Sequence, residues 1–454
     1  MSLLHVYKAV GTAMLLGGIV GSMPASAANW LMLQGTEPAS ASERVRAWGF
    51  IQAQYQKDDS DANSTDGYVP AKLIGPNLTS QEQFNVNRAR IGLRGTGFPL
   101  DSSVNYFLLT EFGNNAITAA NNGGASITDA SITINKIPGA RLRAGLFKYP
   151  GAEEGLQAIH VFDYINFTAV SNQLLLERFP NDRYSANSPP ATLPGDGSLN
   201  GFDEPVGAFR DVGVQLFDSF EAGGWEHSYA LMVGNGNGLS FGDNDDNKDR
   251  YLYWSSELPF GGQGPRAEGL KLFVWSQDGK RQLDNTDDDT YNPQEFDRKR
   301  SGLGVKYLKM PFRVTAEYMQ GEGMIFVGPD KPTFDINPAA PAGNGEEGEA
   351  DGYYLDFGYY IPNSKWQLDL RYDVYNRLTD DTDLPAGPLA GRDFLMEFTT
   401  TTVGVNYHFN KKSRLTLNYE MHEAEAPDWG SEEGPNDNLD GISDRIALQL
   451  THIF

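Results

Sequence analysis

Cysteine is absent from this 454-residue chain. Its absence excludes disulfide bridges, thiolate metal sites, thiol nucleophiles and covalently attached c-type haem. The six histidines are scattered without the H-E-x-x-H spacing of a zinc site, and no G-x-S-x-G elbow occurs. The glycines of "GNGNG" at 234–238 end an expected strand that no helix follows, so they do not form a phosphate-binding loop. The sequence therefore predicts no enzyme and no cofactor.

Basic residues are in short supply. The chain has 36 lysines and arginines against 60 acidic residues, a formal net charge of −24. This balance argues against nucleic acid as a partner. Much of the acid falls in turn-rich runs such as "GDNDDNKD", which could bind divalent cations or meet cation-bridged lipopolysaccharide. Asp243, Asp245 and Asn247 resemble the start of a calcium loop, but Lys248 stands where the turn glycine belongs, so no metal site is predicted.

Long apolar runs are missing after the first 27 residues. Those 27 residues have a basic start at Lys8, the apolar core "AVGTAMLLGGIVG" and a small-residue site at 25–27. This pattern predicts a cleaved signal peptide over 1–27 and therefore an exported protein. Residues 28–42 form a lead-in, and 43–454 read as one domain without an apolar helix of membrane-spanning length.

Glycine and aromatic residues are abundant instead, with 50 glycines, 25 phenylalanines and 21 tyrosines, which favours many short strands. Sixteen segments alternate as strands do. They are 43–56, 83–94, 103–113, 126–136, 140–149, 209–218, 225–234, 249–258, 269–276, 296–308, 312–321, 351–361, 365–376, 394–409, 413–422 and 442–454.

The connections between these segments alternate between short and long. "IPG", "KMP" and "NKK" are short, whereas 57–82, 150–208 and 322–350 are long. Transmembrane β-barrels have this asymmetry, with short periplasmic turns and long extracellular loops. A soluble propeller or tandem sandwich is the alternative, but no repeat of 40 to 50 residues is present. The pattern predicts an all-β, sixteen-stranded transmembrane antiparallel barrel.

Arginines mark one face of three expected strands. In "FNVNRARIGLRG" at 84–95, Arg88, Arg90 and Arg94 alternate with apolar residues. A charge facing lipid at the bilayer midplane costs about 2–4 kcal/mol, so we expect these arginines to face the lumen. The same pattern places three further arginines on the lumen face, namely Arg46, Arg141 and Arg143.

Two roles for these arginines stay open. They could pair with lumen carboxylates such as Glu111, Asp129, Asp356 and Asp369 and only hold the wall together. Alternatively, they could form an attractive path for anions.

The connection 150–208 begins with a stretch too apolar for a loop in solvent, "GAEEGLQAIHVFDYINFTAVSNQLLLERF". We expect this third extracellular loop to fold into the barrel and narrow the passage; a compact extracellular flap is the alternative. Its charged residues would face the arginine wall across a constriction. They are Glu153, Glu154, Asp163, Glu177 and Arg178.

Five segments in order resemble the phosphate-selective porin O and P family. They are 84–97, 142–156, 209–217, 229–238 and the terminal strand. The resemblance implies a sixteen-stranded outer-membrane porin, assembled as a homotrimer, with a third loop folded inward and arginines along the path. The acidic residues of the expected constriction loop depart from a phosphate-selective pattern.

The sequence thus predicts a porin of the bacterial outer membrane that allows passive diffusion of small hydrophilic solutes and inorganic ions, with a lean toward anions. A dedicated phosphate or organic-anion channel is one alternative, and a closed barrel serving as a surface scaffold or receptor is another. Outer-membrane lipid and lipopolysaccharide are the expected surroundings.

Overall fold

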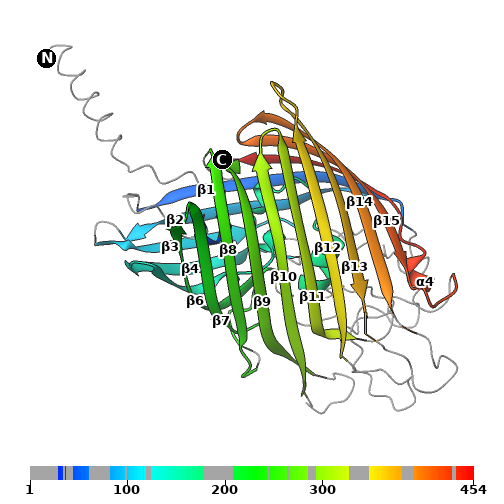
Figure 1. The fold of residues 1–454 in the computed structure, drawn as a ribbon, viewed down its shortest axis with the longest axis horizontal. Coiled ribbons are helices and arrows are strands. Elements are labelled where there is room, and N and C mark those ends of the chain that lie inside the picture. Colours follow the sequence, from blue (N-terminus) through cyan, green and yellow to red (C-terminus); the bar gives the residue numbers. More distant parts are fainter. Residues whose placement is uncertain are drawn as a thin grey trace.

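The chain forms a closed antiparallel barrel of sixteen strands (Figure 1). The computed structural model describes residues 29–33, 36, 44–60, 82–97, 100–115, 117–118, 124–176, 208–243, 245–262, 266–284, 293–326, 347–380, 393, 395–431 and 436–454. Each strand pairs with its neighbours in sequence, and β1 closes on β16 with Ala53 opposite Leu450. The predicted fold class is confirmed, and the predicted segments match the strands in number and order.

The strands differ in length around the barrel. Their bounds are β1 Arg46–Asp58, β2 Glu82–Gly97, β3 Asp101–Glu111, β4 Ser126–Ile137, β5 Ala140–Lys148, β6 Arg210–Ala222, β7 Trp225–Gly234, β8 Asp249–Gly261, β9 Glu268–Asp284, β10 Pro293–Lys309, β11 Phe312–Phe326, β12 Glu347–Tyr360, β13 Trp366–Arg377, β14 Met396–Asn410, β15 Ser413–Glu425 and β16 Arg445–Ile453. The short helical elements are α2 Trp30–Leu33, α3 Glu153–Leu156, η2 Ile159–Val161, η3 Ser171–Leu175 and α4 Asn436–Leu439. No helix in this described part of the chain is long and apolar enough to cross a membrane.

Side chains alternate between an apolar outer face and a polar inner face. On β1, Ile51 is 45% exposed on the outside, whereas the next residue, Gln52, is 1% exposed on the inside. On β16, Ile446, Leu448 and Leu450 are exposed on the same outer face. A period of two is the strand's intrinsic repeat, so a sequence that alternates apolar and polar residues gives the barrel two faces of different polarity.

The two-residue links lie at one end of the barrel. Between β6 and β7, Gly223 and Gly224 adopt φ of 62° and 83°, the conformation that a tight hairpin turn needs and that glycine adopts without steric cost. The links after β4, β10 and β14 are equally short. We call this end of the barrel the short-turn end; β1 starts there and β16 finishes there.

A bulge in β2 fixes where its arginines point. The register between β1 and β2 shifts between Gln52 and Ala53, so Asn87 is an extra residue on β2. On the short-turn side of the bulge, Arg88 pairs with Gln52, Arg90 with Phe50 and Arg94 with Arg46. All three arginines of β2 therefore share the inner face with Gln52.

Candidate functional site

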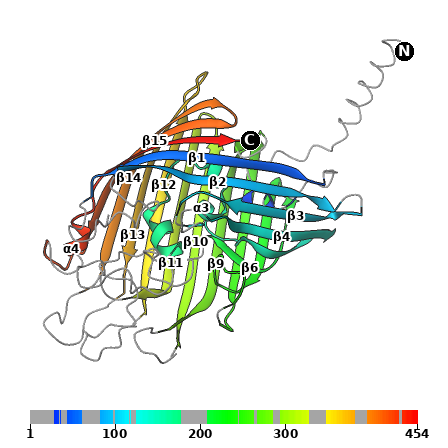
Figure 2. The ribbon, with the colours of Figure 1, turned by 180° about the vertical axis from the view of Figure 1, so that it is seen from behind.

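The segment after β5 occupies the barrel interior. Its described part, residues 149–176, contains α3, η2 and η3, and α3 is seen between the walls in Figure 2. Most of its apolar residues are buried, with Val170, Leu174 and Leu175 completely covered. They join a cluster with aromatic residues of β8 and β9, including Tyr251 and Trp275. We call residues 149–176 the inner segment.

Glu153 is the first anchor of the inner segment. Its carboxylate accepts hydrogen bonds from Lys271 Nζ at 2.7 Å and from Lys306 Nζ at 2.8 Å. Burial opposes ionisation of this carboxyl, but the two ammonium groups outweigh it and hold the pKa of Glu153 at about 2. The backbone N–H of Glu153 also donates to Glu317 on β11, at 3.1 Å. The start of α3 is thus fixed to β9, β10 and β11.

Asp163 is the second anchor. Its carboxylate lies 2.8 Å from Arg266 Nη2, 3.1 Å from Arg313 Nε and 3.6 Å from Arg414 Nη1. Burial favours the neutral acid, yet the three guanidinium groups together lower the pKa of Asp163 far below its usual range. A single carboxylate therefore ties the inner segment to the link before β9, to β11 and to β15.

Backbone groups of the inner segment supply further anchors. Ala169 N donates to Asp373 at 2.7 Å, Ile165 N donates to Asn418 at 2.8 Å, and Arg300 Nε donates to the carbonyl of Leu174 at 2.9 Å. Their partners lie on β13, β15 and β10. Buried backbone groups must find such partners, which explains why an irregular segment can lie inside the barrel. The wall formed by β9–β15 holds it.

The anchors correct one expectation from the sequence. Glu153 and Asp163 were predicted to face the arginines of β2 and β5, but they pair with cations of the opposite wall. That wall carries its own inward bases, Lys271, Lys306 and Arg313, and these lie closer. Glu154 lines a pocket together with the β2 arginines, but its carboxylate lies 3.6 Å from Arg371 Nη1 on β13. The remaining two predicted residues, Glu177 and Arg178, lie outside the described residues.

The β2 arginines differ in their partners. Arg90 Nε donates to Glu111 Oε2 at 2.6 Å, and its Nη2 donates to Thr118 at 3.0 Å. Arg88 donates to Gln52 at 3.2 Å. Arg94, nearer the short-turn end, donates to backbone carbonyls of residues 33 and 36.

The other three predicted arginines lie farther from the inner segment. Arg141 on β5 pairs with Asp218 at 3.1 Å. Arg143 is 1% exposed and packs its guanidinium 4.3 Å from the ring centre of Phe217. Arg46 is exposed at the start of β1. These three are therefore not part of the cluster around Arg88 and Arg90.

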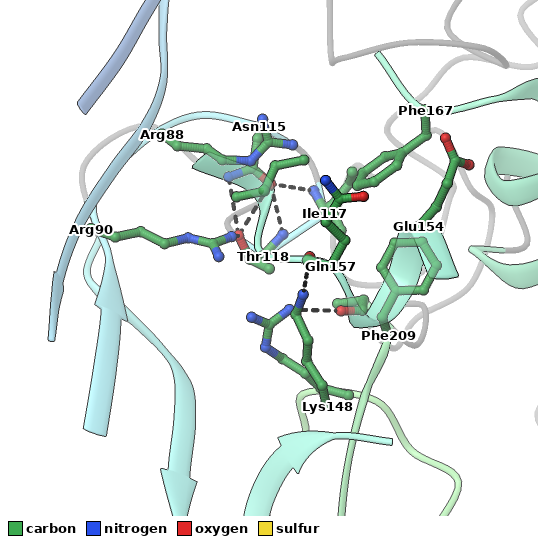
Figure 3. Close-up of a pocket in the computed structure, with 13 residues that line it drawn as sticks. Arg88, Arg90, Asn115, Ile117, Thr118, Lys148, Glu154, Gln157, Phe167 and Phe209 are labelled. Atoms are coloured by element: carbon green, nitrogen blue, oxygen red, sulfur yellow. Dashed lines mark hydrogen bonds between the residues drawn. The ribbon is translucent and has the colours of Figure 1, made fainter. Parts of the chain in front are cut away.

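Four cations meet at a pocket between the inner segment and the β2, β5 and β6 wall (Figure 3). They are Arg88, Arg90, Lys148 and Arg210. The pocket encloses about 310 Å³ between atoms, part of it open to solvent. Its other lining residues are Asn115, Ile117, Thr118, Glu154, Gln157, Ile159, Phe167, Ala208 and Phe209. We call this site the basic pocket.

Lys148 and Arg210 were missed by the sequence reasoning. They pair in register at the end of the β5–β6 ladder, where the chain leaves the wall for the inner segment. Lys148 Nζ donates to the carbonyl of Gln157 at 2.8 Å, and Arg210 Nε pairs with Asp129 at 3.1 Å. Strict alternation along the strands would place both side chains on the outer face. Lys148 is an odd number of residues from the inward-facing Arg143 on β5, and Arg210 is an odd number from the inward-facing Gln215 on β6. The signal available in the sequence was a basic residue at each end of the long connection between β5 and β6.

The basic pocket has mixed charge. Glu154 lines it directly, and Glu111 and Asp129 contact two of its four cations. Over the described residues, no group of three or more histidines and carboxylates is arranged to hold a metal ion. What the arrangement offers is a narrow, charged contact between wall and inner segment, suited to passing or binding a small anion.

Comparisons with known proteins support the fold. No protein-family model matches the chain, and no curated protein matches its sequence. Among solved structures, the anion-selective porin from Comamonas acidovorans aligns with a TM-score of 0.51 at 14% identity, over 90% of this chain and 99% of that one. OmpF of Salmonella typhi, in complex with daunomycin, aligns with a TM-score of 0.52 at 12% identity, over 91% and 98%. At such identities the likeness shows a shared porin fold.

Proposed function

We propose that the protein is an outer-membrane porin that passes small hydrophilic solutes and ions down their gradients, with a lean toward anions. The observation that carries the proposal is the basic pocket, where Arg88, Arg90, Lys148 and Arg210 gather at the narrow contact between wall and inner segment. Transport of this kind needs no covalent chemistry and no cofactor. The shared fold with solved porins supports it.

The anchors of the inner segment favour anions over cations. Glu153 faces two lysines and Asp163 faces three arginines, so the negative charge of these two acids is compensated where it stands. An ion crossing the basic pocket meets Arg88 and Lys148 more closely than these acids. A charged lining at a constriction selects ions of the opposite sign.

General anion preference fits the pocket better than dedication to phosphate. The phosphate-selective porin O and P family, which five segments resemble, implies a dense basic track. Here Glu154, Glu111 and Asp129 alternate with the cations. These acids lower the net positive charge of the lining, so a multiply charged anion is held less strongly there than in a dense basic track. A dedicated phosphate or organic-anion channel therefore remains the second choice.

The closed scaffold or receptor has one observation in its favour. Inward side chains such as Gln54, Gln215 and Arg143 are almost completely buried in this conformation. A passage lined by these buried side chains is narrow. Measurement of conductance distinguishes the closed scaffold from the porin.

The surroundings of the barrel follow from its outer face. Exposed aromatic side chains lie near strand ends, including Trp366 and Phe312 at the short-turn end. Aromatic residues favour the boundary between lipid and water. We infer location in the bacterial outer membrane after removal of residues 1–27, contact with lipopolysaccharide, and assembly as a homotrimer.

The test is single-channel recording in a planar bilayer under a potassium chloride gradient, with phosphate then added. The wild type should show a reversal potential that favours chloride. Arg88→Gln and Arg90→Gln should each shift this potential toward cations. Glu111→Gln is the matched control, because it removes the acid next to Arg90 and should shift the potential toward anions.

The outcomes separate the candidates. Strong block by phosphate would favour the dedicated channel. If none of the three substitutions changes the reversal potential, the arginines serve only as structural ion pairs. Silence of the wild type at every voltage would refute the porin and favour the scaffold.

A further inference from the structure

The N-terminal end of the described chain lies inside the barrel mouth. Asn29 Nδ2 donates to Glu226 Oε1 and to Ser228 Oγ on β7, each at 2.7 Å. The side-chain oxygen Oδ1 of Asn29 accepts a hydrogen bond from Met32 N at 3.3 Å, so Asn29 also caps the N-terminus of α2. One side chain thus starts the helix and attaches it to the wall.

The apolar side of α2 is covered. Trp30 is 4% exposed and Leu31 is 2% exposed, and both belong to the cluster that includes the inner segment. Lys306 on β10 places its ammonium 5.8 Å from the ring centre of Trp30 while it binds Glu153 with the same group. Leu33, the last residue of α2, is 43% exposed. The helix therefore packs against the lumen contents through its first three residues.

Residues 29–33 and Thr36 contact three separate parts of the barrel wall, all at the same distance along the barrel axis. Arg94 on β2 donates to the carbonyls of Leu33 and Thr36. Arg94 lies three residues from the end of β2, Glu226 lies next to the start of β7, and Lys306 lies three residues from the end of β10. All three strand ends are at the short-turn end. The described residues 29–33 and Thr36 therefore lie across the lumen at that end.

We propose that α2 with its cap Asn29 is a gate at the short-turn mouth, which narrows the passage while docked and opens it when released. The inference rests on the proposed channel function. The inner segment is fixed by clusters of buried ion pairs, whereas the described contacts of α2 are a few hydrogen bonds and the packing of Trp30, Leu31 and Met32. Among the described contacts, α2 forms no buried ion pair with the wall, so it can leave without breaking one.

A cysteine pair tests the gate, and the absence of native cysteine makes the pair unique. Asn29→Cys with Ser228→Cys places thiols at two side chains in contact. Single channels of the oxidised double variant should stay at the lowest conductance level. Reduction with dithiothreitol should restore openings. The two single cysteine variants control for oxidation effects.

A second variant tests the same idea without a crosslink. Trp30→Ala combined with Leu31→Ala should loosen the docked helix and raise mean conductance at least about twofold. Leu33→Ala changes the exposed last residue of the same helix; it is the matched control and should behave as the wild type.

The failure of the gate differs from the failure of the channel. Equal conductance of the wild type, the oxidised pair and the Trp30→Ala/Leu31→Ala variant would overturn the gate and leave the channel intact. Silence of every variant would overturn both proposals.

Discussion

Replacing Asp163 by asparagine should release the inner segment from the wall. Asp163 is the shared partner of Arg266, Arg313 and Arg414. Without its charge, Arg313 still has Asp369 at 2.8 Å. Among the described residues, the hydrogen-bond partners left to Arg266 and Arg414 are neutral, namely the Tyr360 hydroxyl and the Phe162 carbonyl. Removing one partner of a buried ion pair costs about 3–5 kcal/mol, because the other charge stays buried and uncompensated.

The cost should appear as local opening. About 3 kcal/mol corresponds to at least about a hundredfold change in an opening equilibrium. Hydrogen exchange followed by mass spectrometry should therefore show peptides covering 159–176 exchanging at least about a hundredfold faster, while the strands of the barrel keep their protection. The protein would be held in lipid vesicles at neutral pH.

Glu295→Gln is the matched control for this measurement. Glu295 pairs with Lys280 at 3.2 Å, but both side chains are about half exposed. Such surface pairs contribute little, so exchange of 159–176 should not change. If Asp163→Asn leaves the exchange of these peptides unchanged, the anchoring role assigned to the carboxylate is refuted.

Two further predictions use pH and the outer face. The pKa of Glu153 is lowered by Lys271 and Lys306, against the effect of burial, from an ordinary 4.5 to about 2, so its pairing stabilises the inner segment fully above pH 4.5 and is lost as the pH falls through 2. Exchange protection of α3, corrected for intrinsic rates, should be constant between about pH 7 and 5 and decline below 4.5, and a decline that begins above pH 5 would contradict this assignment. Leu450→Arg puts a charge on the outer face of β16 and should cost about 2–4 kcal/mol of unfolding free energy in vesicles, whereas Leu100→Lys in a short turn should cost little. Equal stability of both variants would show that Leu450 does not face lipid.

The sequence was informative where the physics is local. Alternation of Ala89, Ile91 and Leu93 with arginines assigns each side chain to a face, because a strand repeats every two residues and lipid excludes charge. Turn residues between the strands, such as Gly223 and Gly224, mark where the chain reverses. These signals need no knowledge of distant residues, and they were sufficient to predict sixteen strands in order.

The same local signals failed at the ends of strands. Lys148 and Arg210 belong to the basic pocket although their place in the alternation suggests the outer face. The chain turns inward there, so the strand period no longer governs where their side chains point. The position of α2 was equally open, because a short lead-in with one tryptophan can lie outside the barrel or within it.

The sequence by itself determined the barrel, its polar interior and the arginines of β2, since each depends only on neighbours along one strand. Tertiary structure alone decided that Glu153 and Asp163 pair with the β9–β15 wall. It also decided that four cations meet beside the inner segment and that Trp30 packs against Lys306. The partners of Glu153 and Asp163, like Trp30 and Lys306, are more than a hundred residues apart in sequence. Charges in a closed lumen pair with whichever opposite charge lies nearest in space, and closure of the barrel determines which one that is.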